Sequence, residues 1–87
     1  MNKHTRPTLQ KLELIFKELA YSVRYEKGNF NSGYCLVEDN RVVIVNKFFD
    51  IDGRVNVLLD ILTVILEDES TLSEKSKLFF KQLLKNH

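Results

Sequence analysis

Three stretches of the chain place apolar residues at helical spacing. Residues 8–20 carry apolar side chains every three or four positions, which predicts an amphipathic helix. Residues 53–68 are apolar around most of the helical circumference, with the polar side chains in one narrow stripe. Residues 72–85 repeat the amphipathic pattern, and Thr71 with Glu74 matches a capping box at the start of this helix.

Between the first two predicted helices the period shortens. Residues 21–25 alternate apolar and polar side chains, as a half-buried strand does. Residues 34–38 and 42–45 predict two further strands, and the unbroken apolar run 42–45 is typical of a strand covered on both faces. The Gly- and Asn-rich residues 27–33 predict a loop. Asp39 and Asn40 predict a two-residue hairpin turn.

These elements predict a single α+β domain over residues 1–87, with residues 1–6 disordered. The order is α-β-β-β-α-α, and three consecutive strands predict a three-stranded antiparallel meander packed against helices. We expect the helix 53–68 to lie at the centre, with Asp50 or Asp52 as its N-cap. A chain of 87 residues is long enough for one hydrophobic core.

Composition removes several classes of function. Thirteen Lys and Arg against twelve Asp and Glu leave a net charge of +1, so no strongly basic face or tail stands out. No apolar stretch resembles a signal peptide or a membrane span, which predicts a cytoplasmic protein without a membrane partner. Cys35 is alone, and His4 and His87 lie near the chain ends. We therefore expect no disulfide, no metal and no cofactor.

No group of residues predicts catalysis. Asp50-Ile51-Asp52-Gly53 is superficially similar to a calcium loop, but the following residues do not continue the loop, so helix capping is the better interpretation. Cys35 has no His or Asp in a recognisable companion motif and is interpreted as a small apolar core residue. We expect no enzyme. An enzyme with an unrecognised site is one alternative.

Basic and aromatic residues near the predicted sheet form a candidate binding surface. Its members are Arg24, Lys27, Phe30, Arg41, Lys47 and Arg54. Bases stack on aromatic rings and phosphates pair with Lys and Arg, so a nucleic-acid or regulatory binding module is a second alternative. Acidic Glu26, Glu38 and Asp39 are interspersed with the cations, and nucleic acid is therefore the less favoured partner.

Residues 9–67 resemble a set of short uncharacterised bacterial proteins. The resemblance lies in YSVRYEKG from Tyr21, SGYC from Ser32, VVIVNKF from Val42 and the apolar helix from Arg54. The chain is also similar to the minimal zinc-peptidase domain of phage-type repressor-cleaving proteins. In that family a helix carries His-Glu-x-x-His, whose histidines bind zinc while the Glu activates water.

Here Leu59 and Thr63 stand where the two histidines would be, and Asp60 stands where the Glu would be. No metal ligand carries over, so the resemblance implies a degenerate zincin-like scaffold that binds no zinc.

The favoured function is a non-catalytic interaction module. The apolar circumference of residues 53–68 exceeds what one small sheet and two helices readily cover, which predicts a symmetric homodimer through the last two helices. The alternative is that the first and last helices cover this segment within one chain. A different protein partner remains open.

Overall fold

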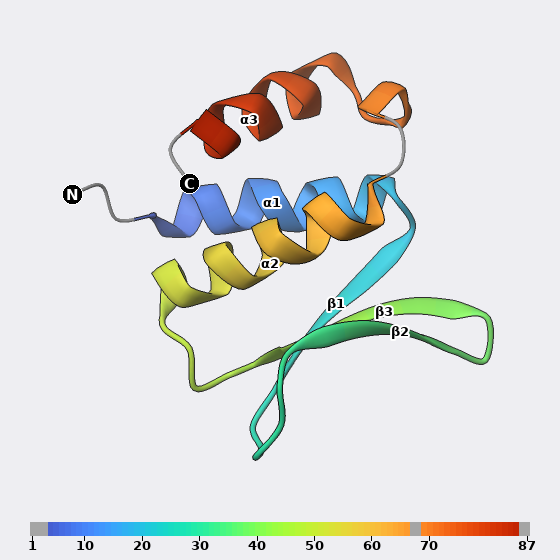
Figure 1. Ribbon diagram of the computed structural model, residues 1–87, viewed down its shortest axis with the longest axis vertical. Helices are drawn as coiled ribbons and strands as arrows, with labels where there is room; N and C mark the ends of the chain where they lie inside the picture. The colour runs from blue at the N-terminus through green and yellow to red at the C-terminus, as the bar shows by residue number, and fades with distance from the viewer. Residues whose placement is uncertain (1–3, 67–68, 86–87) are drawn as a thin grey trace.

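The computed structural model describes residues 4–66 and 69–85. The elements confirm the α+β class and the predicted order (Figure 1). Their bounds are α1 Arg6–Glu18, β1 Tyr21–Glu26, β2 Gly33–Val37, β3 Asn40–Asn46, α2 Ile51–Ile65, the short 3-10 helix η1 Glu69–Thr71, and α3 Glu74–Lys85.

The sheet is mixed, and the antiparallel meander is confirmed only for one pair of strands. The strand order is β1-β3-β2, with β3 antiparallel to β2 and parallel to β1. The physical reason lies in β3, where Val42 and Val43 point to opposite faces and both are buried. A strand buried on both faces gains most from the central position. Residues 27–32 connect β1 to β2, and β3 then occupies the central place between these two strands.

The helices lie on one side of the sheet, with α1 between α2 and α3 (Figure 1). The helix predicted to be central, α2, packs on β3, whereas α1 contacts α2, α3 and β1. Tyr21, Val23 and Tyr25 of β1 pack against this core, as their alternation predicts. The sheet therefore contributes one face to a core that the helices complete.

The helix ends follow local capping chemistry. Pro7 lies in the first turn of α1, where its missing N–H leaves no bond unmade. Asp50 caps α2, since its carboxylate accepts a hydrogen bond from the backbone N–H of Gly53 at 2.8 Å. Ser73 rather than Thr71 caps α3: the N–H of Ser76 donates to the Ser73 hydroxyl at 3.2 Å, two residues beyond the predicted cap.

The β2–β3 turn lies one residue earlier than predicted. Its two residues are Glu38 and Asp39, with φ of 50° and 68°. Positive φ at both positions is the geometry of a type I′ turn, whose twist matches that of the two strands. The prediction of a two-residue turn was therefore right in length but placed the turn one residue too late.

The predicted disorder of residues 1–6 falls partly outside the described residues. Residues 1–3 are not described, whereas Arg6 begins α1 and the backbone N–H of His4 donates to the Asp52 carboxylate at 3.0 Å. At the other end of α2, the helix stops at Ile65 and Leu66 is extended, so the predicted continuation is shortened. Residues 67 and 68 of that prediction lie outside the described ranges.

Leu62 tests the core assignment. Its side chain is fully buried, whereas Val64 on the same helix is 66% exposed. We expect Leu62→Asp to unfold the domain, because an unpaired buried carboxylate costs several kcal/mol against a total stability of about 5 to 15 kcal/mol. Val64→Asp is the matched control and should melt close to the wild type. A circular-dichroism melt of each variant measures this, and a folded Leu62→Asp would contradict the assignment.

Candidate functional site

The sheet brings most of the predicted binding residues to one end. Because β1 and β3 are parallel, their last residues adjoin, and the N–H of Lys47 donates to the carbonyl of Glu26 at 2.9 Å. Lys27 follows β1 directly and Lys47 follows β3 directly, and both are exposed. Arg24 is exposed on the sheet face turned away from the helices. Arg41 lies at the opposite end of β3.

Two of the predicted cations hold the fold together. The Arg41 guanidinium donates to the carbonyl of Leu19 at 3.1 Å and lies 5.7 Å from the ring centre of Tyr21. Arg54 donates from Nε to the carbonyl of Phe49 at 2.9 Å and from Nη2 to that of Lys47 at 3.0 Å. Both guanidinium groups thus already bind backbone carbonyls. Arg24, Lys27 and Lys47 remain as exposed cations of the predicted set.

Arg54 also contacts Tyr25, which in turn binds Glu13. Its guanidinium lies 5.0 Å from the ring centre of Tyr25, and the Tyr25 hydroxyl donates a hydrogen bond to the Glu13 carboxylate. Burial raises the pKa of the Tyr25 hydroxyl far above its ordinary value, and the hydrogen bond and negative charge of Glu13 raise it further. The contact connects α1, β1 and the start of α2.

Asn46 is a structural residue that the sequence did not single out as a site. The Asn46 side-chain nitrogen donates to the carbonyls of Gly28 at 2.9 Å and Phe30 at 3.1 Å. The side-chain oxygen, Oδ1, accepts from the backbone N–H of Phe48 at 3.1 Å. Its backbone N–H donates to the Ser32 hydroxyl at 2.9 Å. Asn46 therefore fixes the loop that carries Lys27 and Phe30. A polar residue ending the apolar run 42–45 was the available signal.

Cys35 is exposed, and its interpretation as a core residue is wrong. The strand that carries it, β2, lies at the sheet edge and packs mainly against β3. The helices cover β1 and β3 instead. Cys35 lies opposite Val42 on the sheet face turned away from the helices, and β2 has no outer neighbour to cover it.

The Asp50 carboxylate accepts a hydrogen bond from the N–H of Gly53, as the capping interpretation predicts, and the Asp52 carboxylate accepts one from the backbone N–H of His4. Both residues line a shallow hollow of about 390 Å³ at the start of α2, together with His4, Arg6, Ile51 and Arg54. Within residues 4–66 and 69–85, no three His, Cys, Asp or Glu side chains gather where a metal ion could bind. At the positions compared with zinc ligands, Leu59 is fully buried and the Thr63 hydroxyl donates to the carbonyl of Asp60 at 2.7 Å.

The apolar circumference of α2 is largely covered within one chain. Its buried residues are Val55, Leu58, Leu59, Ile61 and Leu62. Val64 is an exposed exception. The reason to expect a dimer through the last two helices has therefore weakened, and that dimer stays a prediction.

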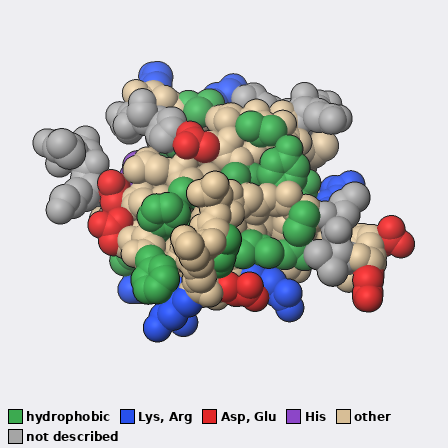
Figure 2. Space-filling model, turned by 60° about the horizontal axis from the view of Figure 1, so that its bottom comes forward, with side chains coloured by type: hydrophobic (Ala, Val, Ile, Leu, Met, Phe, Trp, Pro, Cys, Tyr) green, Lys and Arg blue, Asp and Glu red, His purple; other side chains and the backbone are tan. Residues whose placement is uncertain are grey.

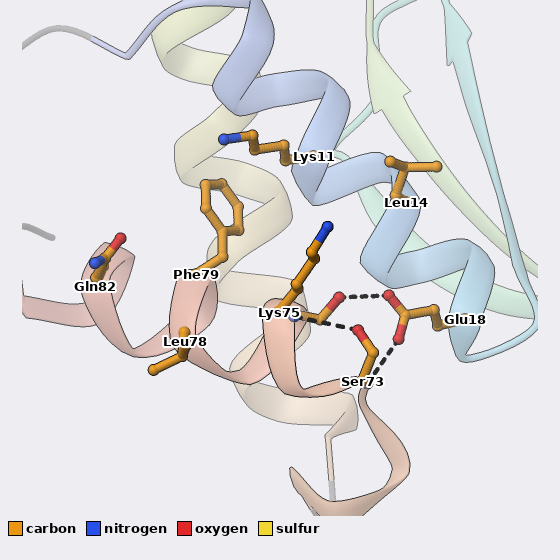
Figure 3. A pocket seen from close by; sticks show the side chains of 9 residues that line it. Lys11, Leu14, Glu18, Ser73, Lys75, Leu78, Phe79 and Gln82 are labelled. Atoms are coloured by element: carbon orange, nitrogen blue, oxygen red, sulfur yellow. Dashed lines mark hydrogen bonds between the residues drawn. The ribbon is translucent and has the colours of Figure 1, made fainter.

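A groove with a largely apolar lining lies between α1 and α3 (Figure 3). Its volume is about 590 Å³. The side chains that line it are Lys11, Leu14, Glu18, Ser73, Lys75, Ser76, Leu78, Phe79 and Gln82. Leu14 is 58% exposed and Leu78 is 63% exposed, on opposite sides of the groove. Two large apolar side chains thus face water where two helices meet.

Glu18 closes one end of this groove. Its carboxylate accepts hydrogen bonds from the N–H of Ser73 at 2.9 Å and from the Ser76 hydroxyl. Burial alone would raise the pKa of Glu18, but the hydrogen bonds from Ser76 and Ser73 lower it below its ordinary value. The negative charge is therefore engaged in joining α1 to α3. Lys11 and Lys75 leave the rim of the groove basic.

No family model, curated protein or solved structure matches this chain. The two resemblances therefore remain predictions. None of the helices in the described ranges has the length and hydrophobicity needed to cross a bilayer.

The buried hydroxyl of Tyr25 predicts a loss of stability at high pH. Its pKa is raised in the folded state, so the folded chain keeps the proton that the unfolded chain releases above about pH 10. The free energy of unfolding should therefore fall as the pH rises from about 9 to about 11. Tyr25→Phe removes this contribution, so its deficit relative to wild type should shrink over that range in urea titrations. Tyr34→Phe is the exposed control. A constant deficit would contradict the prediction.

Asn46→Asp tests the loop anchor. The substitution keeps the shape of the side chain but removes both N–H donors and places a carboxylate near the carbonyls of Gly28 and Phe30. We expect a loss of about 1 to 3 kcal/mol, from hydrogen bonds lost in a partly buried site. Amide hydrogen exchange in residues 28–32 should accelerate. Asn29→Asp, an exposed change in the same loop, should leave both properties near wild type.

Proposed function

We propose that the protein is a non-catalytic interaction module that binds an acidic amphipathic segment of a partner protein in the α1–α3 groove. The observation that carries this proposal is the exposure of Leu14 and Leu78 on the two sides of one groove. Exposed apolar side chains that gather at a depression mark binding sites more often than scattered ones do.

A helix is the occupant that we propose, because the groove lies between two helices, α1 and α3. An α-helix of 12 residues, the length of α3, extends about 18 Å. A helical segment of similar length could lie along α1 and α3, with its apolar residues at three- and four-residue spacing against Leu14, Leu78 and Phe79. Such packing removes from water the side chains that the free protein leaves exposed.

The charges select an acidic segment. Lys11 and Lys75 lie on either side of Phe79 in Figure 3, and the Lys11 ammonium is 5.5 Å from the Phe79 ring centre. Glu18, the acidic residue of the lining, already accepts two hydrogen bonds from α3. Carboxylates flanking the apolar stripe of a partner would therefore meet two cations, which favours association and partner choice. A cytoplasmic location fits this proposal and stays a prediction.

A designed peptide tests the groove directly. The peptide has about 14 residues, with Leu at helical spacing and Glu at the remaining positions, and its match replaces each Glu by Lys. We expect the acidic peptide to shift the amide signals of α1 and α3 in an NMR titration and to bind at least tenfold more tightly than the basic one. Lys75→Glu should reverse that preference.

Substitutions at two residues of similar exposure distinguish binding in the groove from nonspecific hydrophobic binding. Leu78→Glu lies in the groove and should weaken binding of the acidic peptide at least tenfold. Val64→Glu, on α2 and 66% exposed, should leave it unchanged. Signal shifts centred away from α1 and α3, or equal affinity for both peptides, would overturn the proposal.

The nucleic-acid alternative has narrower support. Arg24, Lys27 and Lys47 remain exposed, and Phe48 next to Lys47 is 73% exposed. Arg41 and Arg54, however, bind backbone carbonyls within the fold. Three exposed cations and one aromatic ring make a smaller surface than the sequence predicted.

A further inference from the structure

Strand β2 leaves one edge of the sheet open. It is the outer strand next to β3, and the β2–β3 hairpin extends beyond the helices (Figure 1). Its sequence Gly-Tyr-Cys-Leu-Val contains no charged residue and no proline. Natural edge strands are usually protected from further pairing by charges, proline, bulges or a covering element. β2 has neither a charged residue nor a proline, and it packs mainly against β3.

The turn determines which backbone groups of β2 point outward. In a two-residue hairpin the residues flanking the turn, here Val37 and Asn40, exchange both backbone hydrogen bonds. Pairing alternates along the strand, so Cys35 and Gly33 also direct their N–H and carbonyl groups to β3. The backbone groups of Tyr34 and Leu36 therefore face the open edge, one on each side of Cys35.

This arrangement is self-complementary. We propose that β2 pairs antiparallel with β2 of a second copy of this chain, about a two-fold axis opposite Cys35. Tyr34 then exchanges backbone hydrogen bonds with Leu36 of the partner subunit, and the symmetry repeats the exchange on the other side. The two sheets become one mixed sheet of six strands. This contact is independent of the α1–α3 groove, which lies on the other side of the molecule in Figure 1.

Charge favours the antiparallel arrangement and a second copy as the occupant. The acidic turn Glu38–Asp39 lies at one end of β2, and residues 27–32 lie at the other end with Lys27 and no acidic residue. Antiparallel pairing brings each acidic turn beside the Lys27 segment of the other chain. Parallel pairing would place the two acidic turns together, where they repel.

The surroundings of β2 are suited to burial. Tyr34 is 47% exposed on one face of the strand and Cys35 is exposed on the other. Figure 2, which brings the sheet side forward, shows apolar side chains among backbone and uncharged polar side chains in the middle of this face, with most charged side chains toward its rim. A second strand would cover apolar side chains without burying a charge.

Disulfide formation at position 35 reports the register. Residues opposite each other at a non-hydrogen-bonded position lie about 4.5 Å apart between Cα atoms, a separation that a disulfide spans. With diamide, which takes up the two protons and two electrons that two thiols lose, Cys35 should link two chains into a species of twice 10.2 kDa. In a Cys35→Ser background, Tyr34→Cys and Ser22→Cys should link at least tenfold more slowly. Equal rates at the three positions would overturn the proposal.

A second measurement does not depend on oxidation. Under reducing conditions at about 100 μM, where micromolar association is populated, sedimentation equilibrium should show a dimer for wild type and for Cys35→Thr. Cys35→Lys places two ammonium groups opposite each other at the axis and should weaken the dimer at least tenfold. Circular dichroism confirms that each variant is folded. A monomeric wild type, or a dimer that Cys35→Lys leaves intact while Leu78→Glu dissociates it, would refute pairing through β2.

Discussion

Burial of β3 on both faces is the constraint on which the rest of the structure depends. Val42 and Val43 cannot both be covered at a sheet edge, so β3 takes the middle and its neighbours take the two sides. The parallel β1–β3 pair then brings the residues after both strands together, where Asn46 and Arg54 fix the loops. β2 is left outside with its backbone groups open. One apolar run thus determines where the molecule is closed and where it remains available to partners.

Several polar side chains that could recognise a ligand instead hold the chain in place. Arg41, Arg54 and Asn46 direct their donors to backbone carbonyls, and the Tyr25 hydroxyl donates to Glu13. A half-buried carbonyl without a partner costs free energy, so the donors of Asn46 stabilise the fold, whereas the bonds of Arg41 and Arg54 lie at the surface. The two surfaces that we propose for binding, the α1–α3 groove and the edge at β2, both expose apolar side chains. Association through burial and backbone pairing suits this chain better than recognition by charge alone.

The sequence predicted the elements well because each has a clear period. The helices, the three strands and the inward face of β1 follow from spacing, and Asp50 is a predictable cap. The strand order was missed because alternation shows which face is buried but not which strand lies beside it. The run 42–45 did hold that information, since a doubly buried strand requires neighbours on both edges. The β2–β3 turn was predicted one residue too late and the α3 cap two residues too early, because adjacent polar residues can take the same role.

The candidate sites were harder to predict than the fold. Leu14 and Leu78 are far apart in sequence, and only tertiary packing brings them to one groove. The contacts of Arg41 and Arg54 with carbonyls depend on side-chain reach, which composition does not record. Cys35 looked like a core residue because it sits among apolar neighbours. Its exposure follows from the edge position of β2, which requires the strand order.

The long-range hydrogen bonds of His4 and of helix α1 have a consequence for the order in which contacts can form. His4 is joined to Asp52, and Glu18 is joined to Ser73 and Ser76, across sequence separations of 48 to 58 residues. Such contacts close large loops and slow folding relative to contacts between neighbours. Ser73 and Ser76, which bind Glu18, are synthesised later than α1, β1 and α2. The contacts that join α1 to α3 therefore form only after β1 and α2, which α1 also packs against, have been synthesised.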